Sequence, residues 1–228
     1  MRDEHRPGCT GRAARHLTLG RTSHYCQMFG SAPPFEPQRS HLNHRMIQAT
    51  CVEKLPVLTQ DEICLREVEV SDAAALVALF ARPDVSAHLS PPPADVGAFN
   101  DWIDLSHARR SERRAACYTL LAGDNQDVSG LFMALRLGGD GRAEIGFAMA
   151  PHLWGTGVFL KAARIYLDFI FNQWNVVTLV GRTLERNERG VGAMRKLGAT
   201  VIETADRNGE PELVWTITAA DWKQGSRT

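Results

Sequence analysis

The sequence has no excess of charge of either sign, because 26 lysine and arginine residues balance 26 aspartate and glutamate residues. This balance disfavours a strongly basic nucleic-acid-binding protein and an acidic solvating segment. No run approaches the roughly 20 apolar residues that a helix needs to span a membrane. The longest apolar stretch, 73–81, is typical of a short amphipathic helix. We therefore expect neither nucleic acid nor a membrane as a partner.

Cysteine is sparse and follows no metal or disulfide pattern. The chain has five cysteines, Cys9, Cys26, Cys51, Cys64 and Cys117, without a C-x-x-C motif or a Cys/His spacing. This argues against a disulfide framework and against structural zinc, so we expect no metal. Free thiols, and an N-terminus without a signal-peptide pattern, favour a cytoplasmic protein.

Aliphatic residues are scarce in residues 1–45, where arginine and histidine are frequent. Such a segment cannot bury enough apolar surface to offset its ordering entropy, so we expect a disordered tail. Asp3 and Glu4 count against a transit peptide, although the arginine content is compatible with one. A further hypothesis is that Met46 is the natural start. We expect 46–228 to form one domain.

From about residue 59 the apolar pattern becomes regular and predicts a mixed α and β fold. We expect a strand at 63–70, a helix from the N-cap Ser71 to about 82, and a second helix over about 95–114. Strands at 117–122, 128–137 and 142–150 predict an antiparallel meander. A helix at 157–173, a strand at 176–182 and a helix at 187–197 follow. A hairpin of 200–205 and 212–218 then turns at Asn208-Gly209.

The most informative segment is the glycine-bearing loop before the helix at 157–173. Gly155 and Gly157 leave room for close approach of a ligand, and the first N–H groups of a helix bind anions such as phosphate. Leu160 replaces the third glycine of a dinucleotide-binding fingerprint, and no G-K-[ST] follows for a P-loop. A plain strand-to-helix turn is the alternative.

Four segments resemble the GCN5-related N-acetyltransferase (GNAT) superfamily, especially the branch of ribosomal-protein N-terminal acetyltransferases. They are 59–89, EIGFAMAPHLWGTGVF (144–159), RTLERNERGVGAMRKLGAT (182–200) and the C-terminal hairpin. The resemblance implies the GNAT fold, a central twisted mixed sheet flanked by helices. It also implies an N-acetyltransferase, a monomer or homodimer, that moves an acetyl group from acetyl-CoA to a primary amine. The amine would belong to a protein N-terminus or a small molecule.

The resemblance also implies which residues contact the coenzyme. The loop N–H groups would hold the diphosphate, a splayed strand would offer its backbone to the pantetheine amides, and an asparagine would contact the coenzyme at the next helix. In this chain the loop residues are Trp154, Gly155, Thr156, Gly157, Val158 and Phe159, the strand residues are Phe147, Ala148 and Met149, and the asparagine is Asn187.

Several positions depart from the family pattern. Phe159 replaces a small residue and Gly190 replaces a serine. Met194 stands where many members have a tyrosine that protonates the departing thiolate. These departures motivate an alternative function, a catalytically weak module of the same fold that binds or senses acyl-CoA.

Transfer by direct attack requires a neutral amine and therefore a proton acceptor. Glu144 is the predicted base, because on its strand it shares a face with Gly146 and Ala148, which leave room for substrate or water. The alternative is a glutamate that is solvated or forms a structural ion pair with Arg142 or Arg182. No covalent intermediate is required, so a nucleophilic Cys117 is disfavoured.

Three arginines, a histidine and a tryptophan near these motifs could contact a ligand, but each also has a structural interpretation. Arg182, Arg186 and Arg189 are candidates for contacts with the adenosine phosphates of the coenzyme, although charges at a helix start are usually solvated. His152 is expected at the surface. Trp102 is a candidate for an acceptor groove, but core packing is the favoured role.

Overall fold

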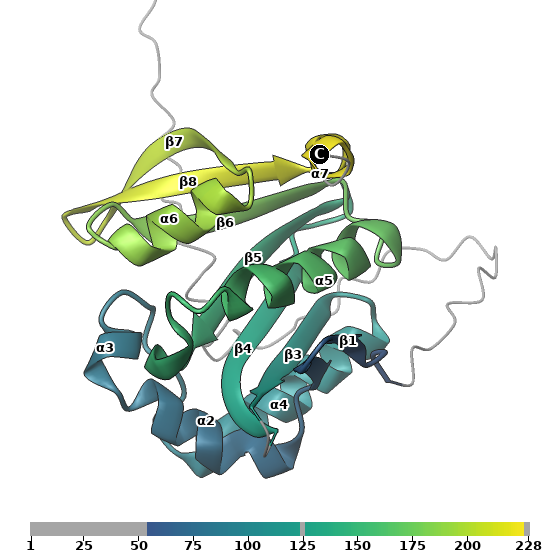
Figure 1. The fold of residues 1–228 in the computed structure, drawn as a ribbon, viewed down its shortest axis with the longest axis vertical. Helices are drawn as coiled ribbons and strands as arrows, with labels where there is room; N and C mark the ends of the chain where they lie inside the picture. The colour runs from purple at the N-terminus through teal and green to yellow at the C-terminus, as the bar shows by residue number, and fades with distance from the viewer. Residues whose placement is uncertain (1–53, 124–125, 226–228) are drawn as a thin grey trace, which may run out of the picture.

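The computed structural model describes residues 54–123 and 126–225, which are arranged around one eight-stranded sheet (Figure 1). Its strand order is β1-β2-β3-β4-β5-β6-β8-β7. The strands are β1 (Leu58–Gln60), β2 (Ile63–Glu67), β3 (Ala115–Ala122), β4 (Asp127–Arg136), β5 (Arg142–Met149), β6 (Thr178–Leu184), β7 (Thr200–Arg207) and β8 (Glu210–Thr218). The expectations for the tail 1–45 and for Met46 lie outside the described residues.

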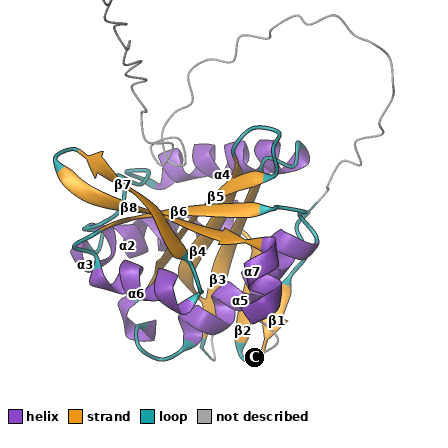
Figure 2. Ribbon diagram, turned by 90° about the horizontal axis from the view of Figure 1, so that it is seen from above, coloured by secondary structure: helices purple, strands orange, loops and turns teal. Residues whose placement is uncertain are grey.

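Helices cover both faces of the sheet. They are α2 (Ala73–Phe80), α3 (Pro83–Ser86), α4 (Val96–Ser111), α5 (Val158–Asn172), α6 (Glu188–Lys196) and α7 (Ala219–Gly225), with the short 3-10 helices η1 (Val70–Asp72) and η2 (Pro151–Leu153). Figure 2 shows α4 on one side of the sheet and α5 and α6 on the other. One apolar core joins α2 and α4 to the sheet, and a second joins α5, α6 and α7 to the opposite face. The expected α/β fold is confirmed.

The sheet is antiparallel except at one place. Strands β3, β4 and β5 form the expected meander. β5 and β6 are parallel, because α5 carries the chain across one face of the sheet between them. This pair spans only Arg142↔Thr178 to Ile145↔Gly181.

Two local expectations were wrong. Ser71 is not a helix N-cap; it lies inside η1, and α2 begins at Ala73. The reason is Asp72, whose carboxylate accepts the Glu69 backbone N–H at 2.9 Å and so starts the turn two residues earlier. In addition, β1, α3 and α7 were not expected, and α3 begins at Pro83, where the preceding helix was expected to end. β1 is three residues long, too short to show a period.

Candidate active site

A cleft opens where β5 and β6 separate. Beyond Ile145 and Gly181 the two strands no longer pair; β5 stays bonded to β4, and β6 to β8. The cleft spans about 420 Å³ of space that is partly open to solvent. Its lining comes from β5, β6, α6, the segment after α3 and the end of β7: His88, Leu89, Ile145, Gly146, Phe147, Gly181, Arg182, Thr183, Asn187, Gly190, Met194 and Arg207.

The edge of β5 that faces this cleft consists of odd-numbered residues. The Ala150 N–H donates to the Ser129 carbonyl at 2.8 Å, so even-numbered peptide groups of β5 point toward β4. By alternation, the peptide groups of Phe147 and Met149 point into the cleft, whereas those of Ala148 point to β4. The Met149 carbonyl accepts the indole N–H of Trp154 at 3.0 Å.

The backbone of the loop at the start of α5 is not covered by side chains at its two glycines. Gly155 and Gly157 have φ angles of 77° and 88°, which side chains rarely tolerate, and a Cβ on either would meet no atom within 4 Å. The Lys161 N–H donates to the Gly157 carbonyl at 3.3 Å and is the first N–H to bond back into α5. The N–H groups of Phe159 and Leu160 precede that bond and form the positive end of the helix dipole.

Phe159 is accommodated by packing rather than by displacing the loop. Its ring centroid lies 4.6 Å from that of Phe147 and 6.1 Å from that of Phe132. Phe132 is fully buried in the core beneath α5. The ring of Phe159 therefore fills the space between the first turn of α5 and the sheet.

Asn187 is the N-cap of α6 and lines the cleft. Its side-chain oxygen accepts the Gly190 N–H at 3.0 Å, which leaves its amide nitrogen as a donor. A Cβ on Gly190 would lie 2.6 Å from that nitrogen and 3.2 Å from a methyl carbon of Thr183. The glycine at this position is thus required by close packing.

Met194 occupies the wall of the cleft across from β5. A Cβ on Gly181 would lie 2.6 Å from the Met194 terminal methyl group, so the two residues fit against each other. The thioether has no proton to donate. Met194 therefore cannot act as an acid on a thiolate leaving group.

Glu144 lies on the predicted face of β5, the face toward α2 and α4, and it is 1% exposed. Its Oε1 lies 3.9 Å from Nε of Arg182. Arg182 also lies 3.3 Å from Glu212, and Arg207 lies 3.4 Å from the same carboxylate. Of the two arginines considered as partners, the structure places Arg182 beside Glu144, as part of a buried chain of four charges that ends at the cleft.

The three candidate arginines have different surroundings. Arg182 belongs to this charge network. Arg186 forms a bidentate ion pair with Glu210 at 2.6 and 3.1 Å. Arg189 is exposed, and its guanidinium carbon lies 4.1 Å above the ring of Trp154.

His88 is a cleft residue that the sequence did not indicate. Its Nδ1 lies 3.1 Å from Nη1 of Arg186. Because a guanidinium can only donate, Nδ1 must accept, and the imidazole is neutral with its proton on Nε2. Desolvation and the charges of Arg186 and Arg189 lower the pKa of His88, which agrees with that state. The sequence alone did not predict this position, because a single histidine in a loop belongs to no motif or hydrophobic period.

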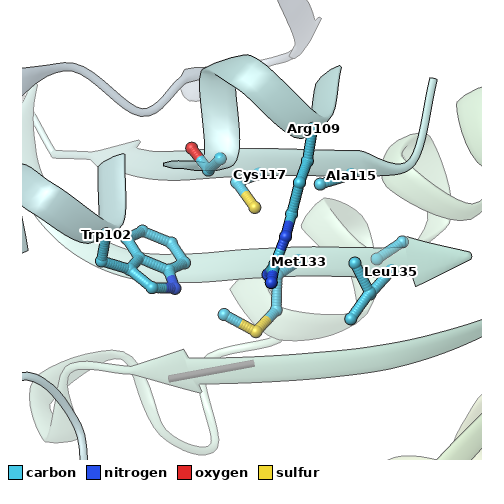
Figure 3. Close-up of a pocket in the computed structure, with 8 residues that line it drawn as sticks. Trp102, Arg109, Ala115, Cys117, Met133 and Leu135 are labelled. Carbon is cyan, nitrogen blue, oxygen red and sulfur yellow. The ribbon is translucent and has the colours of Figure 1, made fainter. Parts of the chain in front are cut away.

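A smaller hollow lies between α4 and strands β3 and β4 (Figure 3). Burial raises the pKa of the Cys117 thiol there to about 12, so it stays protonated at neutral pH and is no nucleophile. Trp102 also lines the hollow; it is 7% exposed and its ring packs edge-on against Phe99 at 6.0 Å, which is a core contact.

His152 is exposed, as expected from the sequence.

Within residues 54–123 and 126–225, no group of three or more histidine, cysteine, aspartate or glutamate side chains is arranged to hold a metal. In the same ranges, no helix is both long enough and apolar enough to cross a membrane.

Residues 62–200 match the model of a family described as an acetyltransferase (GNAT) domain, over more than half of the chain. The chain belongs to the GNAT acetyltransferase family. The family expected from the sequence is therefore confirmed, and the protein is an acyltransferase.

Relatives of this GNAT chain are distant in sequence. It is 23% identical to the uncharacterized N-acetyltransferase p20 of Bacillus licheniformis over 145 residues, 63% of this chain and 82% of the relative. It is 26% identical to the uncharacterized protein YkkB of Bacillus subtilis over 163 residues, 69% and 93% of the two chains.

Solved structures share the fold. A ribosomal-protein-S5-alanine acetyltransferase from Vibrio fischeri superimposes with a TM-score of 0.66 at 14% identity, over 73% of this chain and 98% of that one. RimJ of Mycobacterium smegmatis, in complex with CoA-disulfide, gives 0.62 at 16% identity, over 72% and 90%.

Proposed function

We propose that this GNAT protein is a cytoplasmic N-acetyltransferase that moves the acetyl group of acetyl-CoA to a primary amine. The observation that carries the proposal is the free edge of β5 in the cleft, directly followed by the open loop at the start of α5. Pantetheine amides can pair with the peptide groups of Phe147 and with the Met149 N–H as an added strand would, whereas the Met149 carbonyl is held by the Trp154 indole. Among the loop residues from Trp154 to Phe159, the N–H groups of Trp154 and Thr156 donate to the Pro151 and Leu153 carbonyls at 3.0 and 3.4 Å, and that of Val158 lies 3.4 Å from the Thr156 hydroxyl. We therefore propose that the diphosphate binds mainly the N–H groups of Gly155, Gly157 and Phe159, where the helix dipole favours an anion.

Asn187 completes the proposed coenzyme site from the opposite wall. Asn187 lines the cleft, and since its oxygen is held by the Gly190 N–H, its amide nitrogen is the group it can offer as a donor. Ala148 contributes its small side chain, since its peptide groups belong to the β4 ladder. These residues together offer donors and a free strand edge, which is the chemistry that a diphosphate and an amide-bearing arm require.

In the proposed reaction, the amine attacks the thioester carbonyl, a C–N bond forms and the C–S bond breaks. Glu144 is the proposed base that takes the amine proton through water. It is buried, and it lies two residues before Gly146, which lines the cleft, on the same face of β5. The thiolate leaves with the bonding electrons and takes a proton from water. A thiol has a pKa of about 8.5, so this step needs no strong acid, and Met194 is compatible with turnover.

The acceptor is proposed as a protein N-terminus or a small-molecule primary amine. Among the proteins compared above, one is named an N-acetyltransferase without an acceptor, and one is named for a ribosomal-protein acceptor, so the names support the class of reaction rather than one acceptor. The second candidate, a weakly catalytic module that binds acyl-CoA, is favoured by the thioether of Met194 at the position that supplies an acid in many family members.

The test combines binding and turnover. Calorimetry with coenzyme A measures the site, and mass spectrometry of acceptors measures acetylation without interference from the protein's own thiols. The acceptor panel contains peptides with different N-termini, free amino acids, a polyamine and an aminoglycoside. Acetylation of any acceptor above the uncatalysed rate supports the enzyme; binding without acetylation supports the module; absence of coenzyme A binding overturns both.

A further inference from the structure

The contact between Arg189 and Trp154 joins the start of α6 to the loop before α5. Trp154 lies in the loop before α5, and Arg189 lies in the first turn of α6. The guanidinium carbon sits 4.1 Å from the centroid of the ring. The indole N–H is bonded to the Met149 carbonyl at 3.0 Å, so the ring that carries the guanidinium is itself held in place by β5.

We propose that Arg189 is a coenzyme-binding residue that uses the Trp154 ring as a platform and contacts the diphosphate. This inference rests on the proposed function, and it adds a side chain from α6 to a site otherwise made of backbone groups. A guanidinium stacked by its face keeps all five N–H donors at its edge, where they can bind phosphate oxygens in pairs. The N–H groups of the α5 start follow Trp154 directly along the chain.

The charges around the cleft distinguish Arg189 from its neighbours. Arg186 is engaged by Glu210, Arg182 by Glu212, and Lys161 by Asp61 at 2.9 Å. In the described part of the chain, no carboxylate lies within ion-pair distance of Arg189. Its charge is therefore available to an anion.

The electrostatics of the loop call for such a cation. A helix start supplies only about half an elementary charge, whereas a diphosphate diester carries about two negative charges at neutral pH. A guanidinium resting on Trp154 from α6 supplies a cation at this end of the loop.

The experiment compares Arg189→Gln with Arg195→Gln, which removes the same charge from the other, exposed end of α6. Calorimetry measures the Kd of coenzyme A and of 3′-dephospho-coenzyme A, which keeps the diphosphate, at two salt concentrations. We expect Arg189→Gln to weaken both ligands about tenfold, as for loss of a hydrogen bond between charged groups, and to reduce the salt dependence. Arg195→Gln should change Kd less than twofold, and Arg189→Lys should recover part of the loss.

The outcomes separate this inference from the proposed function. Equal affinity in Arg189→Gln and Arg195→Gln overturns the role of Arg189 and leaves the coenzyme site intact. Weaker binding of coenzyme A alone, with dephospho-coenzyme A unaffected, would assign the contact to the 3′-phosphate and overturn the diphosphate assignment. Failure of the folded wild type to bind coenzyme A would instead contradict the proposed function itself.

Discussion

The carboxylate of Glu144 lies 3.9 Å from the guanidinium of Arg182, and Arg182 is shared with the carboxylate of Glu212. The proposed catalytic base is therefore also a member of a structural charge network. Removal of one partner from a buried pair destabilises a protein, because the other charge is left without compensation. Any test of Glu144 as a base must separate chemistry from this structural cost.

For Glu144→Gln we expect kcat/KM to fall by at least about 10²-fold, the usual size of a general-base contribution. The affinity for coenzyme A should stay near wild type, because the carboxylate points to the α2 and α4 face and away from the α5 loop. The loss should shrink at high pH, where more of the acceptor amine is already neutral. Kinetics across pH, with the Tm measured in parallel, provide the readout.

Glu212→Gln is the matched control, since it disturbs the same network from β8 without touching β5. If both variants lose turnover and Tm equally, Glu144 has a structural role only. A stable Glu144→Gln enzyme with normal turnover across pH would lead to the same conclusion.

Gly157 provides a test of the anion site. Coenzyme A at about 100 times its Kd should stabilise the folded protein by about 2.7 kcal/mol, because the unfolded chain has no site. Gly157→Asp should abolish this ligand-induced shift in Tm by placing a negative charge beside the diphosphate. Gly157→Asn is the control: asparagine tolerates the positive φ of 88° and is neutral. If both variants lose the coenzyme-induced shift in Tm equally, the size of the added side chain, and not its charge, prevents binding.

The sequence predicts most of the core elements because their signals are local. The alternation of 142–150 correctly puts Ile145 and Met149 on one face of β5 and Ala148 on the other. Glycines before an apolar helix likewise indicate the open loop at Gly155 and Gly157. In both cases neighbours in sequence determine the outcome.

The remaining features depend on contacts between distant segments. The pairing of Arg189 with Trp154 and that of His88 with Arg186 require α6 to lie beside the loops that precede α5 and follow α3. Asp72, rather than Ser71, starts the first helical turn because its carboxylate is also bonded to Arg66 from β2. The hydrophobic period or motif of a single segment does not predict contacts with residues that are distant in the sequence.

Phe159→Ala should lower the stability of the protein by about 2–3 kcal/mol, below the usual cost for a fully buried phenylalanine because this ring is only partly buried. The lost contacts are those with Phe147 and Phe132. Coenzyme A affinity should change less than about threefold, because the ring packs on the sheet and the loop offers backbone N–H groups. Urea unfolding and calorimetry measure the two effects. A large gain in affinity would show that the phenylalanine obstructs the ligand.

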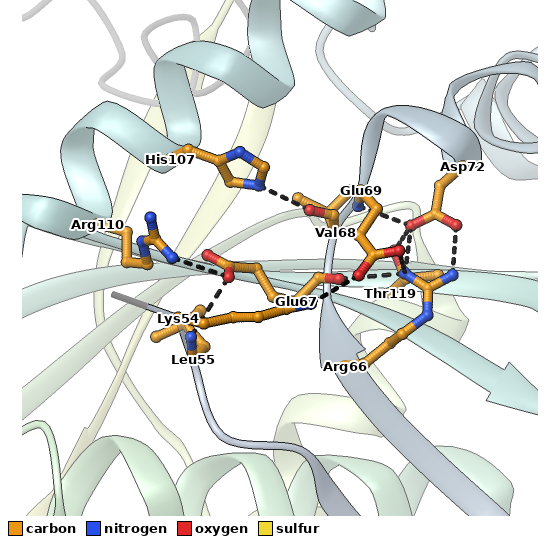
Figure 4. Close-up of polar contacts among 10 residues, drawn as sticks. All are labelled: Lys54, Leu55, Arg66, Glu67, Val68, Glu69, Asp72, His107, Arg110 and Thr119. Carbon is orange, nitrogen blue, oxygen red and sulfur yellow. Dashed lines mark hydrogen bonds and ion pairs between the residues drawn. The ribbon is translucent and has the colours of Figure 1, made fainter. Parts of the chain in front are cut away.

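Asp72 connects β2, η1 and β3 through its buried carboxylate (Figure 4). It accepts two hydrogen bonds from Arg66, at 2.6 and 2.7 Å, one from the Glu69 backbone N–H and one from the Thr119 hydroxyl at 2.8 Å. Burial alone would raise the pKa of this carboxyl, but the hydrogen bonds from Arg66, Glu69 and Thr119 outweigh it and lower the pKa below its usual value.

A carboxyl whose pKa is lowered by folding stabilises the folded state above its unfolded pKa of about 3.9, and this contribution disappears as the pH falls toward the folded value. Asp72→Asn should therefore cost about 2–3 kcal/mol at pH 7, the size of a hydrogen bond to a charged group. The difference from wild type should narrow progressively below about pH 4. Urea unfolding at pH 7, 4 and 3 measures it. Asp84→Asn, which removes an exposed carboxylate paired with Arg82, should leave the unfolding midpoint close to wild type at each pH. A constant difference between Asp72→Asn and wild type across this range would show that shape, and not the charge of the carboxylate, accounts for its effect.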